Sequence, residues 1–162
     1  LSIWSSYSYQ PYRFTEYRQG NTDFTNNQLT GVPGNTWVSG VDMETKMGIY
    51  LNASLNLVST IPLNDANDAY ADSYQLLQGR IGYCKNKFDF FFSVDNGLNQ
   101  IYSLGNDINA IGRRYYNAAA GRNFMFGKHT LAYFIGTIVF CHFLTHQEYS
   151  IIPSHFFTHG LS

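Results

Sequence analysis

The sequence predicts an all-β protein, an antiparallel up-and-down meander of about six long strands that forms part of a transmembrane β-barrel. Three observations lead to this fold class. Apolar and polar side chains alternate over long segments, short and long connections follow each other in turn, and aromatic residues crowd at the segment ends. Together these features are typical of strands that cross an outer membrane.

The segment 47–57 shows the alternation most clearly. Its odd positions read Met, Ile, Leu, Ala, Leu and Leu, and its even positions read Gly, Tyr, Asn, Ser and Asn. Successive side chains of a strand point to opposite faces, so this segment predicts a strand with one apolar and one polar face. At helical spacing the same apolar residues would scatter around the helix axis.

Five further segments carry the same pattern. In 88–95, three Phe and one Val alternate with Asp89, Phe91, Ser93 and Asp95. In 74–84, Leu77, Ile81 and Tyr83 share one face. The remaining expected strands are 3–10, 36–45 and a short run that opens at 122–126.

The connections between these strands differ in length on the two sides. Short turns are expected at Thr45-Lys46 and at Lys85-Asn86-Lys87. Long loops are expected over 18–35, 59–72 and 102–121. Short turns at one rim and long loops at the other are the layout of outer-membrane barrels.

A soluble β-sandwich is the alternative, because its strands also alternate. Strands of about ten residues exceed the usual length of about 5–6 in soluble proteins and can cross a bilayer when tilted. The polar face carries Asn, Ser, Gln, Gly and Arg, as a wet barrel interior would. The aromatic residues expected in interfacial girdles are Trp4, Tyr12, Phe14, Tyr17, Trp37, Tyr70, Tyr74, Tyr83 and Tyr102. These features favour the barrel.

Composition excludes several classes of protein. Ten Lys and Arg against eleven Asp and Glu leave a net charge of −1, which argues against a nucleic-acid binder. Two cysteines cannot build a disulfide-rich scaffold. The sequence has no CxxC or HExxH motif and no uninterrupted apolar run long enough for a membrane-spanning helix. No arrangement of catalytic residues is apparent, so we expect a non-enzyme without a cofactor.

A compositional break divides the chain near position 128. All five histidines follow that position, whereas only two charged residues do, if Lys128 itself is counted. We therefore treat 1–127 and 128–162 as two different kinds of sequence. The chain begins at Leu1 without a signal-peptide pattern, so we expect an internal or C-terminal piece of a longer protein.

Several strings resemble the C-terminal part of TonB-dependent outer-membrane receptors. They are the string Ile61 to Asn67 (IPLNDAN), Tyr74 to Leu77 (YQLL), Arg80 to Tyr83 (RIGY), Leu29 to Pro33 (LTGVP), Tyr102 to Ala110 (YSLGNDINA) and Gly121 to Phe124 (GRNF). Val94 to Tyr102 (VDNGLNQIY) is similar to the family's V-x-N-L-F-N-x-x-Y signature. The resemblance covers about 1–127 and is strongest to siderophore-type receptors of Bacteroidetes-like bacteria.

The resemblance implies that the segment supplies roughly the last six strands of a 22-stranded barrel in the outer membrane of a Gram-negative bacterium. The long loops would then be extracellular and the short turns periplasmic. The family imports ferric siderophores or similar nutrients with energy transmitted by TonB, through an N-terminal plug and a TonB-binding box that this chain lacks. The implied partners are therefore a ferric siderophore or similar small ligand, TonB through that missing region, and outer-membrane lipid, and no nucleic acid. The alternative function is a soluble β-sheet binding module with a Tyr-rich surface.

Two departures from the family pattern stand out. Gly97 replaces a larger apolar residue, so we expect a packing gap that weakens its strand. The match also fades after Gly127, where the family's last strand would end the protein with an aromatic residue. We interpret 128–162 as a non-matching tail produced by a frameshift or a junction artefact. We expect 128–134 to extend the last strand and the remainder to be loose or weakly helical.

The candidate ligand-binding residues are Arg113, Arg114, Tyr115 and Tyr116, in the last long loop. Adjacent Arg side chains can bind carboxylate or phosphate in a two-pronged manner, and Tyr rings can stack on aromatic ligand groups. An anionic ferric chelate would suit them. The alternative is that these side chains pack the loop or line the barrel wall.

Other polar clusters have simpler interpretations. We interpret Asp65, Asp68 and Asp72 as solvated loop carboxylates in preference to a Ca²⁺ site, because they do not match the EF-hand pattern. Arg80, Asp89 and Asp95 share the polar face of neighbouring strands and are expected to form structural charge pairs. His142 and His146 would share one face of a helix, but no motif supplies a third metal ligand.

Overall fold

The computed structural model describes residues 1–130, and residues 131–162 lie outside the described part. The expectations for the tail beyond residue 130, including His142 and His146, fall on those residues. Within residues 1–130, no helix is long and apolar enough to cross a membrane.

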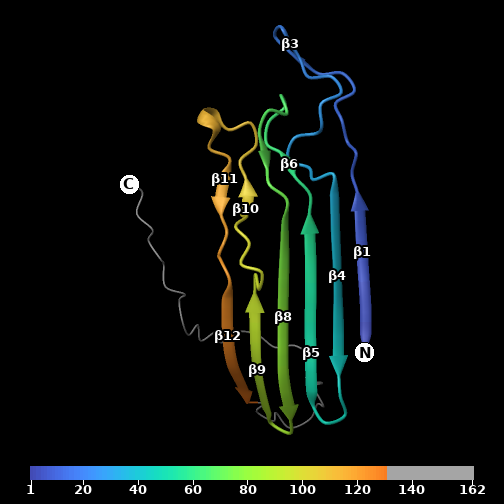
Figure 1. The fold of residues 1–162 in the computed structure, drawn as a ribbon, viewed down its shortest axis with the longest axis vertical. Coiled ribbons are helices and arrows are strands. Elements are labelled where there is room, and N and C mark those ends of the chain that lie inside the picture. The colour runs from blue at the N-terminus through green and yellow to red at the C-terminus, as the bar shows by residue number, and fades with distance from the viewer. Residues whose placement is uncertain (131–162) are drawn as a thin grey trace, which may run out of the picture.

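Six antiparallel strands form the main sheet, in the order β1-β4-β5-β8-β9-β12 (Figure 1). They are β1 (Ser2–Tyr9), β4 (Asn35–Glu44), β5 (Ile49–Val58), β8 (Tyr74–Lys85), β9 (Phe88–Asp95) and β12 (Asn123–Thr130). Each strand pairs with the next one along the sheet in an uninterrupted register. The predicted all-β, six-stranded meander is therefore confirmed, and β12 continues through Lys128 to Thr130.

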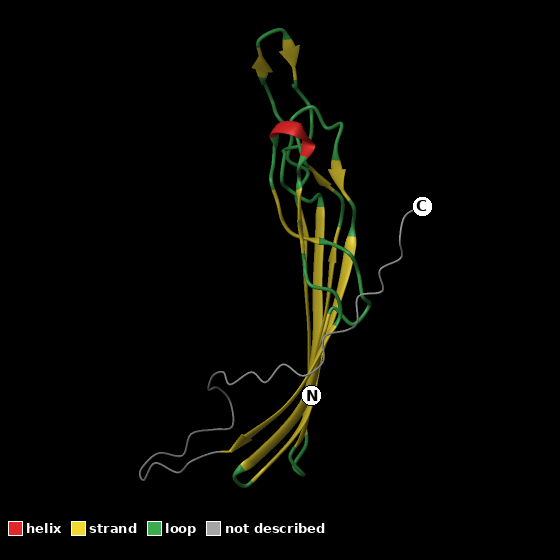
Figure 2. Cartoon of the chain, turned by 90° about the vertical axis from the view of Figure 1, so that its left-hand side faces the viewer, coloured by secondary structure: helices red, strands yellow, loops and turns green. Residues whose placement is uncertain are grey.

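One face of the sheet is mainly apolar. Met43, Leu51, Ile81, Phe92 and Phe126 lie opposite one another in a single row across five strands. Ile81 is 50% exposed and Phe126 is 61% exposed, because the described residues form a single layer with nothing packed on this face (Figure 2). A soluble sandwich would cover such a face with a second sheet.

Two of the aromatic residues expected in girdles lie on the apolar face toward its two ends. Trp37 lies toward the long loops and Tyr83 toward the short turns, both exposed on the apolar face. Tyr74, which was also expected in a girdle, lies on the polar face. The long connections contain Tyr12, Phe14, Tyr17, Tyr70 and Tyr102. The girdle expectation is wrong for Trp4 as well. Its ring lies on the polar face, where its Nε1 donates a hydrogen bond to Asp42 at 3.0 Å.

On the polar face, aromatic rings of one strand lie over glycines of the neighbouring strand. The three pairs are Trp4 on Gly40, Tyr50 on Gly82 and Phe91 on Gly127. A Cβ built on any of these glycines would lie 2.3 Å from the covering ring. These pairs join β1 to β4, β5 to β8 and β9 to β12, which are the strand pairs connected by long loops.

The two short turns use residues that tolerate a left-handed backbone. Gly48 has φ +94°, and a Cβ there would lie 2.1 Å from the carbonyl oxygen of Cys84. This turn delays β5 to Ile49, so that Met47, which was predicted to open the strand, lies in the turn. Asn86, with φ 56°, turns the chain between β8 and β9.

Each long connection contains a short two-stranded ribbon that the alternation did not predict. The ribbons are β2 (Arg18–Gln19) with β3 (Thr22–Asp23), β6 (Ile61–Pro62) with β7 (Tyr70–Ala71), and β10 (Ser103–Asn106) with β11 (Tyr116–Ala118). A 3₁₀ turn, η1 (Ile111–Arg113), lies between β10 and β11. Strands of two to four residues are too short to show an alternating pattern.

Two local expectations on the sheet are corrected. Gly97 lies beyond the end of β9 at Asp95, so it leaves no packing gap inside the strand. Its amide donates to the Leu77 carbonyl oxygen at 2.8 Å. The expected charge pair of Arg80 does not form within residues 1–130, because its guanidinium lies 4.3 Å from the centre of the Phe91 ring.

The carboxylates expected to pair with Arg80 have other surroundings. Asp89 accepts a hydrogen bond from the Tyr50 hydroxyl at 2.9 Å. Asp95 lies two residues beyond Ser93, which is the register partner of Arg80. The guanidinium therefore turns along its strand toward the Phe91 ring and away from Asp95.

Candidate ligand-binding loop cluster

The three long connections meet at one end of the sheet, opposite the short turns (Figure 1). We call residues 10–34, 59–73 and 96–122 the first, middle and last loop. The middle loop lies between the other two and binds both through its backbone. The Gly31 amide donates to the Pro62 carbonyl oxygen at 2.8 Å, and the Asn109 amide donates to the Leu63 carbonyl oxygen at 2.8 Å. The loops therefore form one connected cluster.

Asp65 forms hydrogen bonds to both neighbouring loops of this cluster. Its carboxylate accepts hydrogen bonds from the Tyr17 hydroxyl at 3.3 Å and from the Thr30 hydroxyl, both in the first loop. Its carbonyl oxygen accepts from Asn27 Nδ2 at 2.7 Å, and its amide donates to Asn109 Oδ1 at 3.0 Å. One residue of the middle loop thus ties the first loop to the last.

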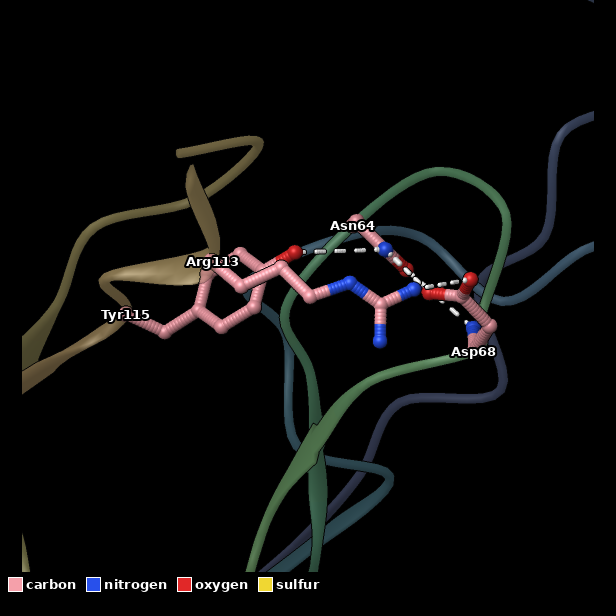
Figure 3. Close-up of polar contacts among 4 residues, drawn as sticks. All are labelled: Asn64, Asp68, Arg113 and Tyr115. Carbon is pink, nitrogen blue, oxygen red and sulfur yellow. Dashed lines mark hydrogen bonds and ion pairs between the residues drawn. The ribbon is translucent and has the colours of Figure 1, made fainter. Parts of the chain in front are cut away.

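A second set of contacts joins the middle loop to the last loop (Figure 3). Arg113 forms an ion pair with Asp68, with 2.8 Å between Nη2 and Oδ2. Asn64 donates through Nδ2 to Asp68 and to the Tyr115 hydroxyl. Both members of the ion pair are more than half exposed, so it contributes at most about 1 kcal/mol.

The four predicted binding residues occupy different environments. Tyr115 is 5% exposed and packs in a small buried cluster with Leu63 and Ala71. Tyr116 is 61% exposed, and its hydroxyl donates to the Tyr70 carbonyl oxygen at 3.1 Å. The structure places Arg113 in the ion pair and Arg114 on the exposed surface just after η1. The four side chains therefore do not form a single binding surface.

A pocket of about 460 Å³, which is open to the surface and which we call the cavity, lies among the three loops. Its volume falls within the range of about 300–1,000 Å³ that is usual for small-molecule sites. Residues of all three loops line it, and Tyr115 is the one among them that was predicted to bind the ligand. The lining residues that sequence reasoning did not single out for binding include Tyr17, Phe24, Asn64 and Asn109. No motif marks them, because they are brought together only by the packing of separate loops.

The electrostatic environment of the cavity is set by Asp65. Partial burial raises the pKa of Tyr17 above its usual value, and the neighbouring Asp65 carboxylate raises it further. At the tip of the first loop, hydrogen bonds from Thr25 lower the pKa of Asp23, with a smaller contribution from Arg18. Burial, the charge of Asp65 and the hydrogen bond to it thus all favour the protonated Tyr17 phenol.

The acidic residues of the middle loop do not gather around a common point. Within residues 1–130, no group of three or more His, Cys, Asp or Glu side chains could hold a metal ion. Asp65 and Asp68 bind other loops, whereas Asp72 is exposed. The interpretation of all three as solvated carboxylates is therefore correct for Asp72 and incomplete for the other two.

No protein-family model matches the chain. Among solved structures, it is similar to the siderophore receptor PiuA from Acinetobacter baumannii, with a TM-score of 0.60 and 17% identity over 78% of this chain. It is also similar to the ferric yersiniabactin uptake receptor FyuA from Yersinia pestis, with a TM-score of 0.50 and 18% identity over 68% of this chain. The matches cover 19% and 18% of those chains, so the chain spans about a fifth of their length. The described part therefore shares the fold of a section of these receptors.

Proposed function

We propose that the chain is the C-terminal wall of a TonB-dependent receptor that imports ferric siderophores or a similar nutrient across the outer membrane of a Gram-negative bacterium. The observation that carries this proposal is the single-layer sheet with one continuous apolar face and long loops at one end. The similarity of fold to two siderophore receptors supports it. The sequence motifs in 1–127 support it independently.

The proposal extends to the parts of the receptor outside the described residues. Residues 1–127 would supply the last six strands of a 22-stranded barrel, and 128–162 would be the non-matching tail. TonB would act through a plug region that precedes this segment, and lipid would cover the apolar face. The closer relation to receptors of Bacteroidetes-like bacteria rests on the motifs alone.

The loop cluster is the proposed ligand-binding region. The prediction that Arg113, Arg114, Tyr115 and Tyr116 contact the ligand stays a prediction. Tyr115 lines the cavity, which supports its inclusion. Arg113 would have to leave Asp68 in order to bind an anion, at a small cost for so exposed a pair.

The two tryptophans provide a test of the membrane-facing surface. Trp37 lies on the apolar face and Trp4 on the polar face of adjacent strands. The protein, as its gene encodes it, is reconstituted in bilayers with and without brominated lipid, which quenches tryptophan in contact with the acyl chains. The variant Trp37→Phe is expected to lose a component of the fluorescence that brominated lipid quenches. The matched variant Trp4→Phe is expected to lose a component that aqueous iodide quenches.

Equal quenching of both components by iodide alone would contradict the membrane assignment. It would favour the soluble binding module with a Tyr-rich surface. Import is tested separately in the source organism. Deletion of the gene is expected to lower uptake of ⁵⁵Fe-labelled siderophores, and the intact gene is expected to restore it. Unchanged uptake of every ferric chelate tried would refute the transport function.

A further inference from the structure

Aromatic rings and one carboxylate line the cavity among the loops. The Tyr17 and Phe24 rings lie 5.5 Å apart, and Tyr115, which is 5% exposed, reaches the lining from the last loop. Asp65 is the one carboxylate in the lining, and the lining contains no Lys, Arg or His. Such a lining attracts positive charge, because both ring faces and carboxylates are negative.

Arg113 does not offset the negative charge of Asp65. Arg113 is held by Asp68, outside the cavity lining. The lining therefore carries a formal charge of −1 from Asp65. Of the cations that neighbour it along the chain, Arg18 is paired with Asp23, and Arg114 is exposed just after η1. An anionic ligand would have to place its charge beside this carboxylate, which is unfavourable.

The Asp65 carboxylate is held in position and can still accept hydrogen bonds from a ligand. Hydrogen bonds from Tyr17 and Thr30 fix one oxygen each. A carboxylate offers about four acceptor positions, so two remain for a ligand. A group already held in its binding conformation loses little entropy on binding.

We propose that the cavity formed by Tyr17, Phe24, Asp65 and Tyr115 binds the positively charged ammonium group of an imported ligand. The ammonium lies against the Tyr17 and Phe24 rings and donates to the Asp65 carboxylate. This inference rests on the proposed function, because the ligand is taken to be an imported iron chelate. It refines that function, since it selects cationic chelates over the anionic chelates that the Arg113-Arg114 pair suggests.

The test uses three iron chelates that differ in charge. Ferrioxamine B is a neutral ferric hydroxamate core that carries an ammonium tail, and its N-acetyl derivative has the same core without the charge. A ferric tricatecholate is the anionic probe. Dissociation constants are measured with the protein in bilayers, as its gene encodes it. Ferrioxamine B is expected to bind about tenfold more tightly than its N-acetyl derivative, and high salt is expected to reduce that ratio.

Three variants connect the preference to the cavity. Asp65→Asn keeps the shape of the side chain and is expected to bring the affinity ratio of the two hydroxamates close to one. Phe24→Leu keeps an apolar side chain without a ring and is expected to lower the ratio by about threefold. Asp72→Asn, an exposed carboxylate of the same loop outside the lining, is the matched control and is expected to leave the ratio unchanged. The ratio, unlike either affinity alone, is insensitive to a loss of folded protein.

The outcomes separate this inference from the proposed function. Equal affinity for the two hydroxamates, or tightest binding of the tricatecholate, would overturn the ammonium site and leave an iron-chelate receptor intact. An affinity ratio that falls equally with Asp65→Asn and Asp72→Asn would also overturn it, because the effect would then come from the net charge of the loops and not from the cavity. Absence of binding for all three chelates would refute the proposed function and the ammonium site with it.

Discussion

Gly82 is the position at which one added methyl group is expected to be most informative. A Cβ at Gly82 would lie 2.3 Å from Tyr50 Cζ and 2.4 Å from its hydroxyl oxygen. The variant Gly82→Ala must displace the ring and with it the hydrogen bond to Asp89. Overpacking costs about 1–3 kcal/mol, and a hydrogen bond to a charged group contributes about 1.5–3 kcal/mol. Because Tyr50 is only half-buried, we expect a net loss of about 2–3 kcal/mol in the free energy of unfolding.

Gly79 provides the matched control on the same strand. A Cβ there would meet Val94 Cγ1 at 3.7 Å, which is an ordinary contact. Gly79→Ala is therefore expected to be neutral or to stabilise the protein by about 0.4–1 kcal/mol. The measurement is unfolding by urea in lipid vesicles. Equal effects of Gly79→Ala and Gly82→Ala, or additive effects of Gly82→Ala and Tyr50→Ala in a double-mutant cycle, would refute the reasoning.

Three further outcomes are expected. Leu51→Arg should lower the free energy of unfolding in lipid by about 2–4 kcal/mol. Gln78→Arg, on the polar face, should change it by less than about 0.5 kcal/mol. Equal losses for the two variants would contradict the assignment of faces. Gly97→Ala should be tolerated, because the nearest atom to the new Cβ is the Leu77 carbonyl oxygen at 3.4 Å; a large loss of stability in the same urea assay would show otherwise. The pKa of Tyr17 is measured as the difference in tyrosinate absorbance between the protein and its Tyr17→Phe variant during an alkaline titration. We expect this pKa to lie above the usual value for tyrosine, and to move closer to that value in Asp65→Asn. Stability from this raised pKa is present below pH 10 and is lost as the pH rises through the folded pKa.

The main sheet could be predicted because its pattern repeats within each strand. A strand with one apolar and one polar face must alternate with period two, and 47–57 and 88–95 do so over most of their length. The boundaries were less predictable. Met47 continues the apolar alternation but lies in the turn, because Gly48 adopts a left-handed backbone there.

The candidate site was predictable only in its location. Residue types in the last loop drew attention to Arg113 and Tyr115, and both lie in the loop cluster. Their roles could not be predicted, because those depend on partners in the middle loop, such as Asp68 and Leu63, that no spacing rule connects to them. The same holds for Arg80, which faces Phe91 and not the acidic residues expected to pair with it.

The sequence by itself determined the six strands, their two faces and the separation of long loops from short turns. Periodicity and connection length are properties of consecutive residues, and a one-residue shift in register would turn every side chain to the wrong face. Only the tertiary structure decided which aromatic rings lie over which glycines and that Asp65 joins three loops. Contacts between segments far apart in the chain are determined by packing in three dimensions, and local sequence carries little information about packing.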